Sequence, residues 1–151
     1  MENRELLSSI KAKFAGINEL PGDEGLLTLA VPAGSLYNVC TELKVNHELD
    51  FDYVMCISGV DLKDKMQVVY HLYSMNNKHK VALKAELDRS SPEITSVAPL
   101  WQAADWHERE AFDMFGIVFK GHPNLTRILT EEGFIGYPLR KDYVGKPDQY
   151  D

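Results

Sequence analysis

The stretch DWHEREAFDMFGIVFKGHP, residues 105–123, concentrates side chains that can do chemistry. Carboxylates and imidazoles are common ligands of catalytic metal ions, and Glu110, Asp113 and His122 form a possible ligand set. However, the order His107-x-x-Glu110 differs from the Glu-x-x-His of di-iron bundles and from the HExxH of zinc proteases. A free-standing metal-dependent enzyme that uses Glu110, Asp113 and His122 is therefore an alternative that the spacing supports only weakly.

The same charges also suit a solvated helix face or a protein interface. On a solvated face, Arg109 would form a ladder with Asp105 and Asp113, but each exposed pair would contribute only ~0.2–0.5 kcal/mol. Asp113 also lies in the last turn of the expected helix, where a carboxylate costs up to ~1 kcal/mol, so an external partner would offset that cost. We therefore favour a protein interface, in which charges flank apolar anchors. The candidate anchors are Trp101, Trp106, Phe112, Met114 and Phe115.

The composition argues against several classes of function. A net charge of −7 disfavours a phosphate backbone, so no nucleic-acid partner is expected. The two cysteines, Cys40 and Cys56, are too few for an iron–sulfur cluster and are expected to be buried, reduced thiols. The chain has no phosphate-binding glycine motif, so neither FMN nor NAD is expected to bind here. No segment reaches the ~18 apolar residues of a membrane helix and no secretory signal is recognisable, so we expect a cytoplasmic protein.

The elements that precede this stretch must position it. Apolar and polar residues alternate along 80–88, which indicates a sheet with one wet face and helices on the other. Short polar connections between the last three strands predict an antiparallel meander. We therefore predict an α+β fold, a two-layer sandwich with a small mixed sheet and helices on one face. His71 and His79 are expected at the edge or surface of this sheet. The expected elements are a helix over 2–14, a strand over 26–31, a helix after Pro32 that buries Leu36, Val39, Cys40 and Leu43, and strands over 51–60, 66–74 and 80–88.

The final third of the chain changes character. Asp105 and Glu108 have the spacing of a capping box, which predicts a helix over 106–115, and Gly116 is expected to end it. Four glycines and three prolines lie within 120–151, which is typical of an irregular segment. The expected division is an α+β domain over 1–119, which includes the helix, and an extended C-terminal docking arm over 120–151.

The charged stretch resembles the signature of a known family. From residue 106 it fits the pattern W-x-E-R-E-x-x-D-M-F-G-I-x-F-x-G-H-P, and the runs RIL at 127–129 and PLRKDY at 138–143 continue the match in order. This pattern is similar to that of the C subunit, or thirty-kilodalton subunit family, of NADH–quinone oxidoreductase, respiratory complex I. The interface residues that the resemblance implies are Trp106, Glu108, Arg109, Glu110, Asp113, Met114, Phe115, His122, Pro123, Arg127, Arg140, Lys141, Asp142 and Tyr143.

The resemblance implies a non-catalytic subunit in the peripheral arm of a proton-translocating NADH–quinone oxidoreductase. It would pack against the large quinone-site subunit (the D type) and neighbouring Fe–S subunits, on the cytoplasmic side of a bacterial membrane that it touches only through the complex. FMN, Fe–S clusters and quinone would lie in partner subunits, with no cofactor in this chain. An alternative is the equivalent subunit of a membrane-bound hydrogenase or of a ferredoxin- or F420-type oxidoreductase. Thr126 and Val144 depart from the family pattern.

Overall fold

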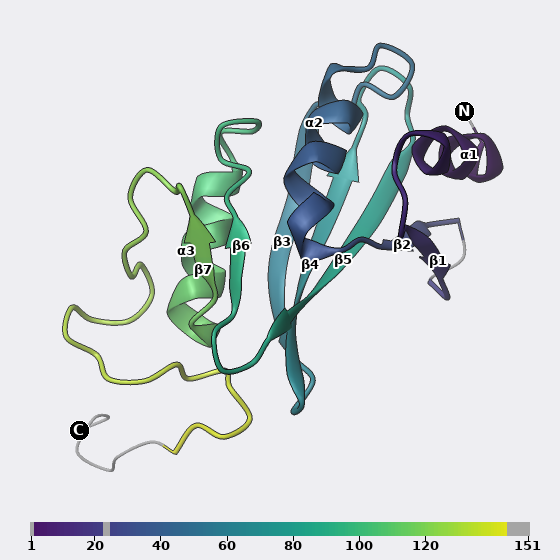
Figure 1. Cartoon of the computed structure of the whole chain (residues 1–151). Coiled ribbons are helices and arrows are strands. Elements are labelled where there is room, and N and C mark those ends of the chain that lie inside the picture. The colour runs from purple at the N-terminus through teal and green to yellow at the C-terminus, as the bar shows by residue number, and fades with distance from the viewer. Residues whose placement is uncertain (1, 23–24, 145–151) are drawn as a thin grey trace.

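The structure, a computed structural model, describes residues 2–22 and 25–144 and has the expected order of a helix, a strand, a helix and three long strands (Figure 1). The elements are α1 (Asn3–Lys13), β1 (Asn18–Leu20), β2 (Leu27–Ala30), the 3-10 turn η1 (Ala33–Ser35), α2 (Leu36–Val45), β3 (Tyr53–Asp61), β4 (Lys65–Tyr73), β5 (Lys80–Asp88), β6 (Glu93–Thr95), α3 (Ala104–Phe115) and β7 (Val118–Lys120).

Among the described residues, the main sheet has five strands in the order β1-β2-β5-β4-β3. β3, β4 and β5 form the predicted antiparallel meander, whereas β2 runs parallel to β5, with Leu29 opposite Leu83. A parallel neighbour in an otherwise antiparallel sheet makes the sheet mixed, and with its helices the fold is α+β, as the sequence predicts. β6 and β7 pair in parallel as a separate two-stranded sheet that the sequence did not reveal.

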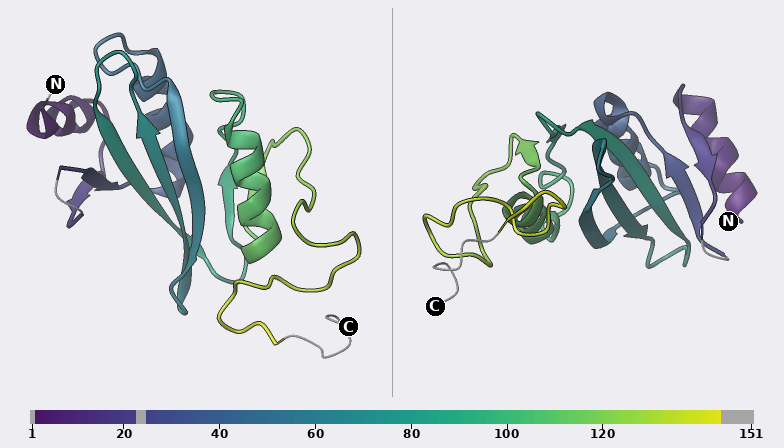
Figure 2. Two further views of the ribbon diagram at one scale, coloured as in Figure 1. Left: turned by 180° about the vertical axis from the view of Figure 1, so that it is seen from behind. Right: turned by 90° about the horizontal axis from the view of Figure 1, so that it is seen from below.

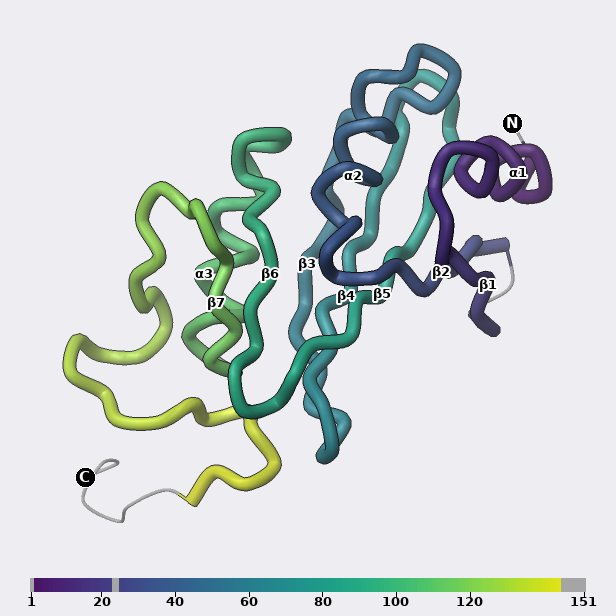
Figure 3. Tube along the Cα trace, in the orientation of Figure 1, coloured from purple at the N-terminus to yellow at the C-terminus, as the bar shows by residue number. Residues whose placement is uncertain are grey.

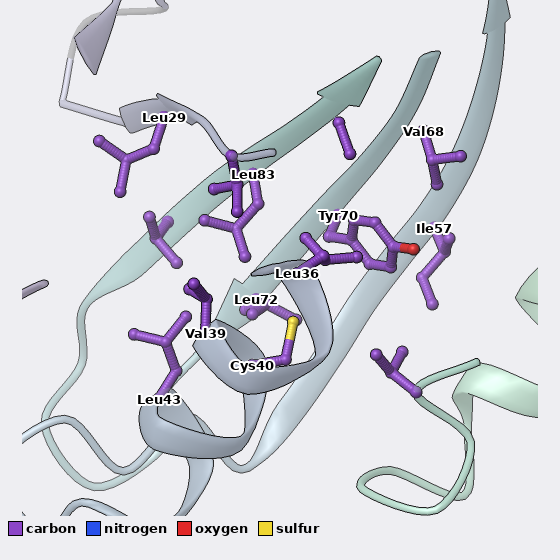
Figure 4. Close-up of a cluster of buried hydrophobic side chains, with 14 of the residues drawn as sticks. Leu29, Leu36, Val39, Cys40, Leu43, Ile57, Val68, Tyr70, Leu72 and Leu83 are labelled. Atoms are coloured by element: carbon purple, nitrogen blue, oxygen red, sulfur yellow. The ribbon is translucent and has the colours of Figure 1, made fainter. Parts of the chain in front are cut away.

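The core lies between α2 and the sheet. The apolar stripe of α2 is fully buried, as predicted, and Figure 4 shows it directed at the side chains of the central strands. Each buried Leu-sized side chain contributes roughly 1.5–3 kcal/mol relative to exposure, so this contact contributes much of the stability of the fold. Burial raises the pKa of the Cys40 thiol far above neutral pH, so the thiol stays protonated.

Three expectations about individual side chains were wrong. His79 is buried, not superficial: its Nε2 lies 2.6 Å from the Leu49 carbonyl oxygen, and its ring packs 4.7 Å from the Phe51 ring. Trp101 is not an interface anchor, because it is 5% exposed and its Nε1–H donates to the Phe51 carbonyl. Cys56 is only partly buried and lies 3.0 Å from the Ser58 hydroxyl.

Helix α3 lies beside the edge strand β3, away from α2 (Figure 2). Gly59 permits this approach, because a Cβ there would lie 2.6 Å from the Phe115 ring. The predicted capping box is wrong: α3 begins at Ala104 with no side-chain cap, and the Glu108 carboxylate turns into the protein instead. The predicted end is confirmed, since Gly116 has φ 77° and its N–H donates to Phe112.

Of the predicted arm, 120–151, residues 145–151 lie outside the described residues and Lys120 belongs to β7. Residues 121–144 form an irregular segment, the described part of the arm. Figure 3 shows that the arm loops outward past α3 and then returns below it, toward the segment that connects β5 and β6. The described part of the arm is thus folded back against its own domain, and this contact builds the candidate site.

Candidate interface site on helix α3 and the arm

The arm is anchored by one carboxylate at the end of α3. Asp113 Oδ2 accepts three consecutive backbone N–H groups, from Ile128 at 3.1 Å, Leu129 at 2.7 Å and Thr130 at 3.0 Å. Its Oδ1 accepts from Arg127 Nη1 at 2.9 Å and from the Thr130 hydroxyl. The Asp113 side chain is fully buried by these contacts. The carboxylate therefore acts as a clamp that fixes a turn of the arm on the helix.

This arrangement corrects two expectations. Burial alone would raise the pKa of Asp113, but the hydrogen bonds from Thr130, Leu129 and Arg127 outweigh burial and lower that pKa to about 2. The unfavourable position of Asp113 in the last helical turn is thus offset from within the chain, not by an external partner. The ladder with Arg109 does not form either, because Arg109 Nη2 donates to the Thr126 hydroxyl at 2.9 Å instead.

Thr126, a departure from the family pattern, therefore keeps a contact with α3. Arg109 Nε also donates to the Thr126 carbonyl at 3.2 Å, and the Arg109 guanidinium lies 4.8 Å from the centre of the Trp106 ring. The arginine is thus held between the arm and an aromatic side chain. Such a contact orders the side chain of Trp106 without covering it, since Trp106 is 62% exposed.

A second clamp joins the arm to the end of the main sheet. Arg140 Nε donates to the Phe115 carbonyl at 2.8 Å, and its Nη2 donates to the Arg89 carbonyl at 3.0 Å. The Lys141 backbone N–H donates at 2.8 Å to Asp61, which also pairs with Arg89. The Arg89 hydrogen bond lowers the pKa of Asp61 to well below its usual range against the effect of burial.

Arg89 also pairs with Asp142: the Nη2 of Arg89 lies 3.2 Å from the Oδ1 of Asp142. Between the two clamps, the Tyr137 ring lies against Gly116, with the guanidinium groups of Arg127 and Arg140 at 5.0 and 5.8 Å. Arg127, Arg140 and Asp142 therefore bind within this chain, whereas the family resemblance implied that they contact a neighbouring subunit. Their contact with a partner stays a prediction, as does that of Tyr143, which packs against Phe134 at 6.3 Å.

At the start of α3, Glu108 is buried in a polar cluster. Its two oxygens accept from the Ser96 hydroxyl at 2.6 Å and from the Val97 N–H at 2.9 Å. Burial raises the pKa of Glu108 to about 7, although these two hydrogen bonds oppose the shift and the nearby Asp105 adds to it. Glu108 is therefore an internal structural group in this chain and does not reach the surface.

His122, the first side chain of the arm to contact α3, closes this cluster. Its Nδ1 accepts the Asn124 N–H at 2.9 Å, so the proton is on Nε2, which donates to the Asp105 carbonyl at 3.2 Å. The same nitrogen lies 3.0 Å from Asp105 Oδ1 and 4.0 Å from Glu108 Oε1. Only the backbone carbonyl of Asp105 is aligned to accept the Nε2–H of His122. The buried Oδ1 of Asp105 therefore accepts no hydrogen bond and has only an electrostatic contact with the ring.

The exposed face of α3 differs from these internal clamps. Trp106, Glu110 and Met114 follow one another at intervals of four residues, so they form a stripe along one side of the helix. Beside this stripe, a groove of about 260 Å³ separates α3 from β3. Its lining is Cys56, Ile57, Ser58, Gly59, Glu110, Ala111, Met114, Phe115 and Leu139. Pro123 is exposed at the start of the arm.

These positions do not assemble the metal site of the alternative hypothesis. The Asp113 oxygens are occupied by protein donors and the His122 ring by Asp105 and Asn124, whereas Glu110 is exposed. Across residues 2–22 and 25–144, no group of three His, Cys, Asp or Glu side chains is placed to hold a metal ion. The same part of the chain contains no helix that is long and apolar enough to cross a membrane.

Several important residues were missed by the sequence interpretation. Ser96, Arg89 and Asp61 hold α3 and the arm, yet none lies in the charged stretch. A usable signal existed for two of them: in an antiparallel meander β3 and β5 end at the same end of the sheet, on either side of β4, which brings Asp61 near Arg89. Ser96 offered no such signal, because it follows a strand of only three residues.

The fold and the site define a class of small α+β proteins whose own charges hold a C-terminal arm on a helix and leave one helix face exposed. Residues 29–149 match the family model of the respiratory-chain NADH dehydrogenase, 30 Kd subunit, and the chain belongs to this family. The resemblance seen in the sequence is thereby confirmed, and the chain is a member of a family of respiratory-complex subunits.

Curated relatives are named as subunits of NADH-quinone oxidoreductase. The NADH-quinone oxidoreductase C subunit 2 of Rhizobium meliloti (strain 1021) is 42% identical over 141 residues, which cover 91% of this chain and 77% of that protein. The NADH-quinone oxidoreductase C subunit of Chloroherpeton thalassium (strain ATCC 35110 / GB-78) is 50% identical over 103 residues, which cover 67% of this chain. The match spans only 43% of the Chloroherpeton protein, so that relative extends well beyond the matched region.

Two solved structures share the fold. The trypsin-resistant fragment (1-134) of Nqo5 superposes with a TM-score of 0.73 at 27% identity, covering 83% of this chain and 100% of the fragment. A chain of the membrane-bound sulfane sulfur reductase, an archaeal respiratory membrane complex, superposes with a TM-score of 0.78 at 26% identity, covering 93% of this chain and 85% of that chain.

Proposed function

We propose that this chain is a non-catalytic, peripheral-arm subunit of a proton-translocating NADH–quinone oxidoreductase. Family membership supports the assignment, as do the names of its relatives. The structural observation that carries it is how the side chains of α3 are distributed. Glu108 and Asp113 are buried and hydrogen-bonded within the chain, whereas Trp106 and Glu110 are exposed. An exposed tryptophan is typical of a protein interface, because interfaces are enriched in aromatic side chains.

In this proposal the partner is the large quinone-site subunit, and neighbouring Fe–S subunits complete the contact. Electrons pass from NADH through FMN and Fe–S clusters in other subunits to quinone, and this chain holds none of these cofactors. The chain lies on the cytoplasmic side of the membrane and reaches it only through the complex. The exposed stripe of α3 and the arm supply the docking surface, with Pro123, Lys141 and the other predicted interface residues close to it.

A second candidate has support of its own. The superposition on a chain of the sulfane sulfur reductase, a different respiratory membrane complex, favours the equivalent subunit of a related oxidoreductase. The same docking surface would serve there, because the electron donor is chosen by other subunits. The 42% identity with a subunit named for NADH and quinone favours the first candidate.

Deletion and complementation separate the two candidates. Membranes from cells that lack the chain are assayed for quinone reduction with NADH, and with reduced ferredoxin as the alternative donor. We expect the NADH-dependent rate to be lost and to return when the wild-type chain is supplied. Normal NADH-dependent quinone reduction without the chain, together with loss of another donor's activity, would favour the second candidate.

A further inference from the structure

Within the described part of the chain, the groove between α3 and β3 is lined by a single charged side chain, that of Glu110. All its other lining residues are apolar or small, and Leu139 from the arm, 55% exposed, forms part of its rim. Glu110 is exposed and makes no hydrogen bond or ion pair with the other described residues, although the neighbouring carboxylates Glu108 and Asp113 are both satisfied. The groove therefore combines an apolar floor with one unneutralised negative charge.

The size of the groove fits side chains better than trapped water. Its volume of about 260 Å³ is many times the ~30 Å³ that one water molecule occupies in the liquid. Its floor carries few polar groups, the Cys56 thiol and the Ser58 hydroxyl, and these two already lie 3.0 Å from each other. Water there would find few further partners, so filling the groove with apolar atoms is favourable.

We propose that this groove receives an extended segment of a protein partner, in which an arginine or lysine pairs with Glu110 and an adjacent apolar side chain fills the floor. The proposal rests on the proposed function and names the chemistry of the partner segment. Trp106 and Met114 flank Glu110 on the same stripe and would cover the ion pair from water, which strengthens it.

Charge favours such a partner over a second copy of this chain. Each copy carries a net charge of −7, so two copies repel one another as whole molecules. In addition, a self-complementary contact would have to bring a basic side chain to Glu110. The arginines of α3 and the arm, Arg109, Arg127 and Arg140, are all engaged within their own chain, and Lys141 lines a separate hollow beside Arg89 and Asp142. A basic segment of a different protein meets neither obstacle.

Cys56 reports directly on whether the groove is filled. The chain has two cysteines, and Cys40 is fully buried, so N-ethylmaleimide distinguishes them. The rate of alkylation of Cys56 is measured by mass spectrometry in the free chain and in the complex purified from membranes. We expect at least a tenfold slower reaction in the complex, with Cys40 unreactive in both samples as the internal control.

Charge reversal tests the ion pair. Glu110→Gln and Glu110→Arg are compared with Glu5→Arg, a change of an exposed helical glutamate on α1. We expect each Glu110 variant to unfold at the wild-type temperature as a free chain. In the complex we expect Glu110→Arg to reduce incorporation by roughly 30-fold or more, Glu110→Gln to reduce it less, and Glu5→Arg to leave it unchanged.

The outcomes separate this inference from the proposed function. If the chain co-purifies with the complex but Cys56 reacts at its free rate, or if Glu110→Arg is incorporated normally, the groove is not the docking site and the proposed function stands. If the wild-type chain never co-purifies with other subunits, the proposed function fails and its partner segment fails with it.

Discussion

Replacing Asp113 by asparagine should release the arm while leaving the domain folded. The carboxylate accepts five hydrogen bonds, three of them from consecutive backbone N–H groups of residues 128–130. An asparagine side chain has one acceptor oxygen, so it can satisfy one side of the clamp only, and its NH₂ group then faces the donors of the other side. The Arg127 guanidinium loses its charged partner in either orientation.

The size of this effect can be taken from the pKa of Asp113, because protonation removes the charge of the carboxylate just as the asparagine substitution does. Lowering the pKa of Asp113 from 3.8 to about 2 corresponds to ~2 kcal/mol of stabilisation by the ionised form. Because the folded-state pKa is depressed, this stabilisation is complete above pH 3.8 and is lost as the pH falls through about 2. We therefore expect Asp113→Asn to cost ~2 kcal/mol at neutral pH, confined to the arm.

Hydrogen exchange measured by mass spectrometry resolves this local effect. A loss of ~2 kcal/mol corresponds to roughly 30-fold faster exchange of the amides of residues 128–130. Amides in the core strand β4 should exchange at the wild-type rate, and Asp64→Asn, at an exposed turn, serves as the matched control. Unchanged exchange at 128–130, or equal acceleration in β4, would refute the view that Asp113 clamps the arm.

Three further predictions concern α3 and its surroundings. The pKa of Glu108 is about 7 in the folded chain against 4.5 when unfolded, so protonated Glu108 stabilises the fold and this stabilisation is lost as the pH rises through 7. Glutamine does not titrate, so between pH 4.5 and 8 the unfolding free energy of Glu108→Gln in urea should rise by ~3 kcal/mol relative to that of the wild type. A difference that does not change with pH would contradict this. Gly59→Ala should cost about 1–3 kcal/mol in thermal unfolding, since its Cβ would overlap the Phe115 ring; no loss would show that the ring yields freely. Gly116→Ala combines φ 77° with a 2.8 Å approach to Tyr137, so it should cost about 1–2 kcal/mol and accelerate exchange in the arm, and an unaffected arm would rule out that contact.

Sequence patterns predicted the elements whose cause is local. The buried stripe of α2 and the three long strands arise from regular apolar periodicity, and Gly116 ends α3 because the left-handed conformation favours glycine. The α+β class followed from these elements. β6 and β7 escaped notice because such short strands carry no readable period, and their pairing joins Glu93 to Val118, on the two sides of α3 in the sequence.

The sequence placed the charged stretch on a helix, but it did not predict the contacts that its side chains make within the chain. The spacing of Asp105 and Glu108 fits a capping box, yet the Glu108 carboxylate accepts hydrogen bonds from Ser96 and Val97, which lie eleven or twelve residues away in the sequence. Likewise, Asp113 finds its partners in Arg127 and the backbone of 128–130, a segment with no regular structure. Which charges stay exposed is decided by such tertiary contacts, so the free carboxylate of Glu110 became visible only in the fold.

The most direct test of the central claim is a gentle affinity purification of the tagged chain from detergent-solubilised membranes, with mass spectrometry of the proteins that accompany it. The account predicts a stoichiometric set of respiratory subunits that binds flavin and iron–sulfur clusters and oxidises NADH, with cross-links from residues near Trp106 and Glu110 to the large quinone-site subunit. Recovery of the chain alone, from an extract in which the respiratory complex is intact, would contradict it.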